Sequence, residues 1–149
     1  MTARGQSLKL VLINNDKKMQ FKIVSLIVVA LFYCVQANAQ NMQKGKKIYE
    51  AKCLACHQAD GGGVPNMNAP LDAASNVVGK DIARLVRIIR YGYNERIALD
   101  GLYYSNAMTA SPDLKDNEIA DLLTYIRNSW SNKASAVTIA QVQAAKKKK

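Results

Sequence analysis

The chain has 149 residues and a formal net charge of +10, with 21 lysines and arginines, 11 acidic residues and one histidine. This length leaves room for one domain and a targeting segment rather than for several folded domains. The basic residues are scattered and are not interleaved with aromatic side chains, so nucleic acid is not an expected partner.

The N-terminal part has the pattern of a secretory signal peptide. Three lysines precede an apolar run at residues 23–35, which is followed by the A-x-A sequence at 37–39. We therefore predict an N-terminal extension and signal peptide at 1–39, with cleavage before Gln40. A membrane anchor is the less favoured alternative, because the apolar run has 13 positions and a transmembrane helix needs about 20. The product is expected to be periplasmic or otherwise exported.

A helix is predicted from about Gln43 into a C-x-x-C-H motif formed by Cys53, Cys56 and His57. This motif is the attachment signature of c-type haem, in which two thiols bond the porphyrin vinyl groups and the histidine binds the iron. A thioredoxin-like pair would need a surrounding βαβ pattern, which is missing. A zinc site would need four ligands, and no cysteine or histidine follows residue 57.

Two further helices are predicted from apolar spacing. Ile82, Leu85, Val86 and Ile89 define one helix at 81–91, with Asp81 near its start and Gly92 just beyond its end. Residues 116–130 define a stronger amphipathic helix, for which Asp113 or Asp116 is the predicted cap.

The remaining segments are predicted to be loops, a short last helix and a tail. The loops at 58–79 and 92–115 are longer than a compact domain normally contains, and a flat cofactor would explain them. No hairpin or sheet is predicted. Thr138 and Gln141 form a capping box that opens a short helix. The domain is expected at 40–145, followed by a solvated lysine tail at 146–149.

The charge of the exported part argues against a strongly basic surface. Five of the basic and one of the acidic residues lie within 1–39, so the remainder has 16 basic and 10 acidic residues and a formal charge of +6. Four of these positive charges belong to the tail. Contact of this tail with a membrane surface is possible but is the less favoured alternative. The third cysteine, Cys34, lies in the predicted signal peptide, which leaves no cysteine for a structural disulfide.

The second axial ligand of the iron is limited by the composition. His57 is the only histidine, so ligation by two histidines is excluded. Met42 lies at the start of the helix that carries the motif, where it is badly placed to reach the opposite face of a haem. Met67 follows His57 by ten residues and Met108 by 51, beyond a whole helix. We predict Met108 as the distal iron ligand, with Met67 as the alternative.

Taken together, these residues resemble the class I cytochrome c family over residues 43–144. Besides the motif, the resemblance includes the Asp-Gly-Gly-Gly sequence at 60–63, Pro70-Leu71, and a methionine before the last main helix. The run at 114–130 is similar to monohaem cytochrome domains associated with quinoprotein dehydrogenases, and 136–144 resembles their C-terminal extension.

The resemblance implies an all-α, class I cytochrome c fold, in which three main helices and long loops wrap around one covalently bound haem. It implies that the first helix crosses the last, with Gly45 allowing close approach near Tyr125. It also implies that a backbone carbonyl, of Ala69 or Pro70, orients His57. One departure is that Thr109, rather than the family's usual proline, follows Met108.

The predicted function is electron transfer by a single haem c ligated by His57 and Met108. The expected partners are redox proteins such as an exported dehydrogenase or a terminal oxidase. Catalysis is not expected, because the one histidine is committed to iron and no other catalytic constellation can be assembled. Two alternatives stay open, namely a haem sensor or gas-binding protein with an open sixth site and a fixed cytochrome subunit of a dehydrogenase complex.

Overall fold

The computed structural model describes residues 19–27 and 42–145. The chain divides into two units, Met1–Ala39 and Gln40–Lys149, and residues 19–27 of the first unit are helical. The predicted cleavage site at 37–39 and the lysine tail lie outside the described residues. Within the part described, no helix is both long and apolar enough to cross a membrane.

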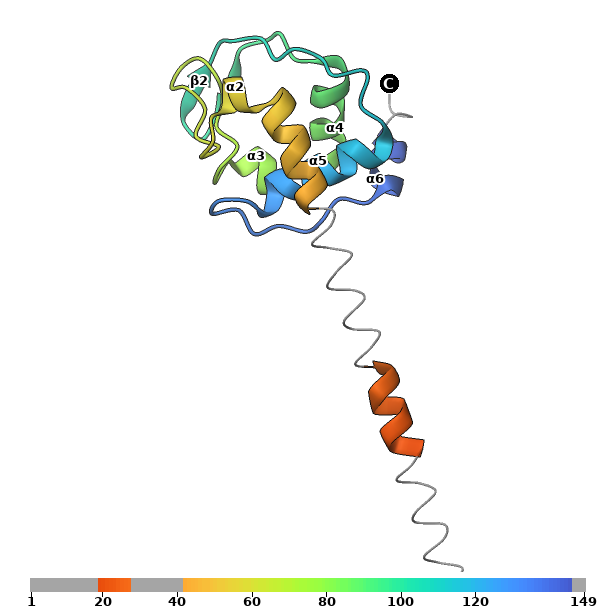
Figure 1. Cartoon of the computed structure of the whole chain (residues 1–149). Coiled ribbons are helices and arrows are strands. Elements are labelled where there is room, and N and C mark those ends of the chain that lie inside the picture. The colour runs from red at the N-terminus through yellow and green to blue at the C-terminus, as the bar shows by residue number, and fades with distance from the viewer. Residues whose placement is uncertain (1–18, 28–41, 146–149) are drawn as a thin grey trace, which may run out of the picture. The chain divides into compact units, whose positions relative to one another are not determined.

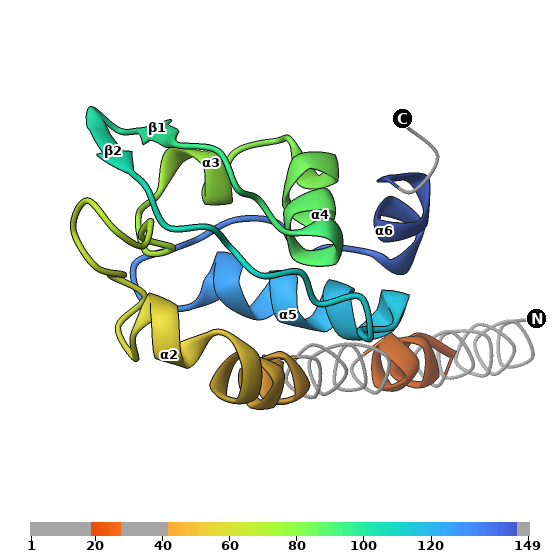
Figure 2. The same cartoon turned by 90° about the horizontal axis from the view of Figure 1, so that it is seen from above.

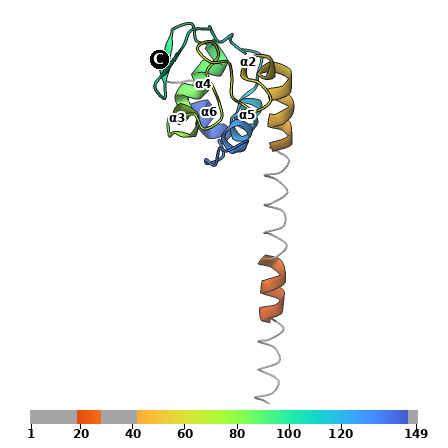
Figure 3. The ribbon, with the colours of Figure 1, turned by 90° about the vertical axis from the view of Figure 1, so that its left-hand side faces the viewer.

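The second unit is mostly helical (Figure 1). A helix at 42–52 leads into the short α2, and the chain then forms α3, α4, the strands β1 and β2, α5 and α6. Figure 3 shows α5 between the helix at 42–52 and α4. The predicted helical fold class is confirmed. The bounds are α2 Leu54–His57, α3 Ser75–Val78, α4 Ile82–Tyr91, β1 Ile97–Leu99, β2 Leu102–Tyr104, α5 Asp116–Asn128 and α6 Ile139–Ala145.

Helix α4 follows the predicted pattern. The Oδ1 atom of Asp81 accepts a hydrogen bond from the backbone N–H of Arg84 at 2.9 Å, which satisfies a free donor in the first turn. The helix ends at Gly92, whose φ of 74° is readily adopted only by glycine. The four predicted apolar residues of this helix are all buried. Sequence spacing therefore located this element and its core-facing side correctly.

Helix α5 is slightly shorter than predicted, and its start is built differently. The carboxylate of Glu118 accepts a hydrogen bond from the backbone N–H of Lys115 at 2.8 Å, and Lys115 is the N-cap residue. The prediction of Asp113 or Asp116 as cap was therefore wrong. At the other end Ser129 is extended and donates its hydroxyl to the carbonyl of Tyr125 at 2.7 Å, which ends the helix two residues before Trp130.

The first and last main helices approach each other closely, as the resemblance implied. A side-chain carbon at Gly45 would lie 2.6 Å from Cβ of Tyr125, so only glycine permits this approach. Beside it, the rings of Tyr49, Tyr125 and Trp130 form a cluster with centroids 5.4–6.0 Å apart. This cluster joins the helix that carries the haem motif to α5 and to the chain that follows it.

The expectation that no hairpin would form was wrong. Strands β1 and β2 pair antiparallel, with Ile97 opposite Tyr104 and Leu99 opposite Leu102. Asp100 and Gly101 connect them and both have positive φ, 50° and 85°. An Asp-Gly pair is a strong signal for a two-residue hairpin turn, but the strands are only three residues long and show little alternation.

Helix α6 begins with the predicted capping box. Thr138 N–H donates to the side-chain carbonyl of Gln141 at 2.8 Å, and Gln141 N–H donates to the Thr138 hydroxyl at 3.2 Å. Val142 is fully buried, and α6 packs against both α4 and α5. Figure 2 shows α6 beside α4 at one end of the unit.

Candidate haem-binding site

The C-x-x-C-H motif lies where the helix at 42–52 turns into α2. The backbone N–H of His57 donates to the carbonyl of Cys53 at 2.9 Å, so the motif occupies one turn of helix. Residues three and four positions apart share a helix face, which places both thiols and the imidazole together. Cys53, Cys56 and His57 all line one cavity, which we call the ligand cavity.

The two thiols have different surroundings. Cys53 is half-buried, whereas Cys56 is exposed. Burial raises the pKa of the Cys53 thiol to about 11, and the neighbouring Cys56 contributes in the same direction. The Cys53 sulfur is therefore protonated at neutral pH in the haem-free chain, which makes it a poor nucleophile on its own.

His57 is held by the loop that follows it. Its Nδ1 atom lies 2.9 Å from the carbonyl oxygen of Ala69, the residue before Pro70. A carbonyl accepts only, so Nδ1 carries the proton and Nε2 keeps its lone pair. Burial lowers the pKa of His57, which favours the neutral imidazole that binds metals. The carbonyl that the resemblance implied, of Ala69 or Pro70, is that of Ala69.

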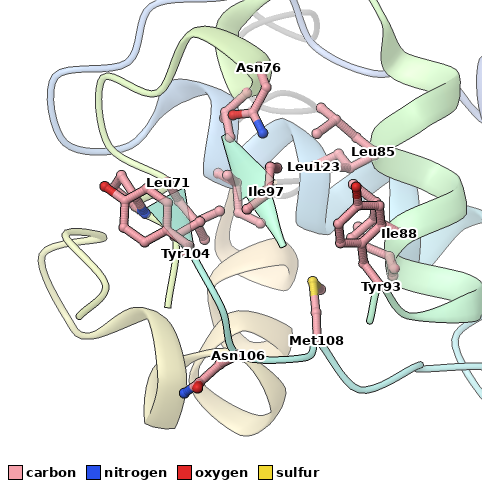
Figure 4. A pocket seen from close by; sticks show the side chains of 15 residues that line it. Leu71, Asn76, Leu85, Ile88, Tyr93, Ile97, Tyr104, Asn106, Met108 and Leu123 are labelled. Carbon is pink, nitrogen blue, oxygen red and sulfur yellow. The ribbon is translucent and has the colours of Figure 1, made fainter. Parts of the chain in front are cut away.

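A second cavity adjoins the first and is mostly apolar (Figure 4). We call it the apolar cavity. Three residues, Ile89, Asn106 and Met108, line both cavities, so the two share a wall.

The residues that line the two cavities have the chemistry that a haem requires. Cys53 and Cys56 supply two thiols for the porphyrin vinyl groups, and His57 supplies an imidazole nitrogen for the iron. The adjoining cavity is lined mostly by apolar side chains, which suit a porphyrin ring. The residues present therefore fit this cofactor. Asn76 also lines the apolar cavity, and its buried Oδ1 atom, which can only accept, has no hydrogen-bond partner among the described residues.

The candidate methionines lie in different surroundings from one another. Met108 is half-buried and lines both cavities, and Figure 4 shows its sulfur pointing into the apolar cavity. Its backbone pairs with Tyr93 through two hydrogen bonds of 2.7 and 2.9 Å. Met67 is 49% exposed. Neither Met67 nor Met42 is among the residues that line the two cavities.

Other residues of the site were not predicted from the sequence. Asn76, Tyr93 and Tyr104 line the apolar cavity although they are far from the motif in the chain. No local motif distinguishes them from ordinary loop residues. Asn76 lies in α3 and Tyr104 in the hairpin, neither of which was predicted, and Tyr93 pairs with Met108 just after α4.

Comparison with known proteins agrees with this site. The pattern of the family described as Cytochrome c matches residues 42–130. Cytochrome c-552 of Thermus thermophilus is 35% identical over 91 residues, which is 59% of this chain and 69% of that protein. The cytochrome c subunit of the quinone alcohol dehydrogenase of Gluconacetobacter polyoxogenes is 36% identical over 107 residues, 66% of this chain but only 21% of that subunit.

The gluconate 2-dehydrogenase cytochrome c subunit of Pantoea cypripedii is 30% identical over 107 residues and is covered over 23% of its length. The alignments thus span about two thirds of the cytochrome c-552 and about a fifth of the dehydrogenase subunits.

A helical fold with two motif thiols and an imidazole lining one cavity, next to a second, mostly apolar cavity, is the arrangement of a protein that binds haem c. The chain belongs to the cytochrome c family. It binds haem c covalently and is a cytochrome c electron carrier.

Proposed function

We propose that this chain carries one electron at a time between redox proteins outside the cytoplasm, with one haem ligated by His57 and Met108. The observation that supports this most is that His57 and Met108 line the same cavity, which Met67 does not. When bound, the haem iron supplies the Fe(III)/Fe(II) couple. The thioether of Met108 is soft and neutral, so it stabilises Fe(II) and raises the potential.

Each motif residue has a separate task in this proposal. Cys53 and Cys56 attach the porphyrin through thioether bonds, and the exposure of Cys56 brings that edge to the surface. His57 donates its Nε2 lone pair while Ala69 fixes the ring. Ile89 and Leu122 line the same cavity and supply part of its apolar surface.

Electron exchange is proposed at the surface near Cys56. Lys52 lines the ligand cavity and forms an ion pair with Asp113 at 2.7 Å, so these two charges largely compensate each other. A neutral, mixed polar surface suits the small, short-lived contacts of redox proteins. The named relatives, which are cytochrome c subunits of dehydrogenases, favour a dehydrogenase as donor. A terminal oxidase is the candidate acceptor.

The proposed partners do not require catalysis by this chain, because substrate chemistry takes place on the donor. The fixed-subunit alternative is supported by the similarity to dehydrogenase cytochrome subunits. The two can be distinguished by purification, because a fixed subunit co-purifies with a large partner and a free carrier does not. The alternative of a haem sensor with an open sixth site is supported only by Thr109, which stands in place of the family's usual proline after Met108.

The ligand assignment is tested by comparing Met108→Ala with Met67→Ala in the haem-loaded protein. Removal of the distal thioether leaves a weak-field or vacant sixth position. We expect Met108→Ala to lose the methionine–iron charge-transfer band, to become high spin and to bind carbon monoxide faster, while Met67→Ala retains the wild-type spectrum. The opposite pattern would assign the ligand to Met67. A wild-type protein that is already high spin would favour the sensor.

A further inference from the structure

The segment after α5 holds the loop on which His57 depends. We propose that Asn132 is a positioning residue for the haem histidine, acting through the backbone of residues 69–73. This inference rests on the proposed ligation of iron by His57. It concerns a side chain that lies 75 positions from the histidine and does not line either cavity.

The side chain of Asn132 is buried, with 3% of its surface exposed, and uses all its hydrogen-bonding groups. Its Nδ2 atom donates to the carbonyls of Leu71 at 2.9 Å and Ile126 at 2.8 Å. Its Oδ1 atom accepts from the backbone N–H of Ala73 at 2.9 Å. Two donors and one acceptor are what a primary amide offers, so neither a carboxylate nor an apolar side chain can replace it.

These bonds connect the last turn of α5 to the loop at two points. Leu71 is also held from the other side, because its N–H donates to the carbonyl of Gly61 at 2.7 Å. Gly63 N–H in turn donates to the carbonyl of His57 at 3.1 Å. The loop is therefore fixed between the backbone of His57 and the amide of Asn132.

The connection from Leu71 to Ala69 is short and stiff. Only Pro70 lies between them, and its ring fixes φ near −65°. The residue before a proline is restricted as well, which limits Ala69. Fixing the position of Leu71 therefore largely fixes the direction of the Ala69 carbonyl, which lies 2.9 Å from Nδ1 of His57.

The strength of this last bond affects the iron. A carbonyl that accepts the Nδ1 proton raises the basicity of a metal-bound imidazole. A more basic ligand stabilises Fe(III) relative to Fe(II). Loosening the loop by changing Asn132 weakens this hydrogen bond, and we therefore expect the reduction potential to rise.

The test compares Asn132→Leu with Ser131→Ala in the haem-loaded full chain. Leucine is close to asparagine in size, lacks both N–H donors and adds no charge that would itself shift the potential. Ser131 is adjacent and also binds the loop, through Asp72, but from an exposed position. We expect Asn132→Leu to increase the Fe(II)/Fe(III) ratio at a fixed potential about threefold, which is about 30 mV at 59 mV per tenfold change. We also expect faster exchange of the His57 Nδ1 proton in NMR spectra. Ser131→Ala is expected to change neither.

A folded Asn132→Leu protein with an unchanged potential and unchanged proton exchange overturns the proposal, as does an equal change in Ser131→Ala. If Asn132→Leu does not fold, Asn132→Ser, which keeps one hydroxyl donor, is measured in the same way. Failure of both to fold would make Asn132 a purely structural residue and also overturn the proposal. The wild-type NMR spectrum separates this from failure of the proposed function, because a His57 that does not bind iron lacks strongly shifted ring protons.

Discussion

The two long loops of the domain are held in different ways. The histidine-side loop, 58–79, is bound by side chains of α5 and of the segment after it. Arg127 and Asn132 donate to its carbonyls, and Trp130 donates to the carbonyl of Ala59 at 2.9 Å. The methionine-side loop, 92–115, is held by backbone bonds and by exposed side-chain contacts, such as the ion pair of Lys52 with Asp113.

On the methionine side, the side-chain hydrogen bonds of the described residues lie at exposed positions, and backbone bonds hold the segment around Met108. Met108 pairs with Tyr93, and Ser111 N–H donates to the carbonyl of Ile89 at 2.7 Å. Asn106 N–H donates to the carbonyl of Met67 at 3.0 Å, so this loop partly depends on the other. We infer that packing in the core of the domain fixes the position of His57. The methionine-side loop is where we expect the site to unfold locally first.

The strongest test of the histidine side is Arg127→Ala. Arg127 is 2% exposed, and its guanidinium donates to the carbonyls of Val77, Gly79 and Ser135. Its removal leaves buried acceptors unpaired, so we expect a loss of about 3–5 kcal/mol in the free energy of unfolding, measured by denaturant titration. Arg87→Ala on α4 is the control, because Arg87 makes none of the hydrogen bonds or ion pairs described. A loss below about 1 kcal/mol for Arg127→Ala would contradict this account of the loop.

A smaller and more local effect is expected for Gly92→Ala on the methionine side. Gly92 has φ of 74°, and an added Cβ would lie 2.5 Å from the carbonyl oxygen of Met108. We expect a destabilisation of about 2–4 kcal/mol from strain and crowding. The methionine–iron band should be lost at lower denaturant concentration than the helical signal.

The matched control is Gly101→Ala at the hairpin turn. Gly101 has a similar positive φ of 85°, but nothing lies within 4 Å of an added Cβ. We expect about 1–2 kcal/mol of destabilisation. The methionine–iron band and the helical signal should then be lost together. Separate loss of the band in this control too would remove the distinction between the two loops.

The smallest expected effect is a pH dependence of the free energy of unfolding, which arises from Asp72 at the edge of the histidine-side loop. The side-chain hydroxyl and backbone N–H of Ser131 both donate to Asp72, and these bonds lower the pKa of Asp72 from its ordinary value of 3.8. A lowered pKa in the folded state adds stability above pH 3.8, which is lost as the pH falls through the folded-state pKa. We expect wild type to exceed Asp72→Asn by less than about 1 kcal/mol at pH 6, since the pair is exposed.

This difference should shrink as the pH falls from 3.8 through the lower pKa of Asp72 in the folded state, because both proteins carry a neutral side chain at position 72 once that pKa is passed. Denaturant titrations of the two proteins at pH 6 and pH 3 measure the change. A gap that widens on acidification would contradict the assignment of this stability to the Asp72 carboxylate.

Most of the helical fold could be predicted because its signals are local. Apolar spacing and Asp81 located α4, and the capping box at Thr138 located α6. The start of α5 was missed because its signal is Glu118, which binds back to Lys115, rather than an acidic residue ahead of the helix. The hairpin was missed although Asp100-Gly101 is a recognised turn pair.

Candidate site residues could be predicted from the sequence only where they belong to a motif or to a residue type with few members in the chain. Cys53, Cys56 and His57 are defined by spacing, and Met108 by elimination among few methionines. Asn132 binds Leu71 across 61 positions and Arg127 binds Val77 across 50, so no local pattern indicates these contacts. They arise only when α5 packs against the histidine-side loop.

The central claim is that one haem lies between His57 and Met108. The most direct measurement is an NMR spectrum of the reduced, haem-loaded protein with its methionine methyl groups labelled with carbon-13. A methyl group bound to low-spin Fe(II) lies over the porphyrin ring and is shifted far upfield. The account predicts a single such signal, and that it disappears in Met108→Leu. A signal that survives this substitution and is lost in Met67→Leu, or the absence of any upfield methyl in the wild type, would contradict it.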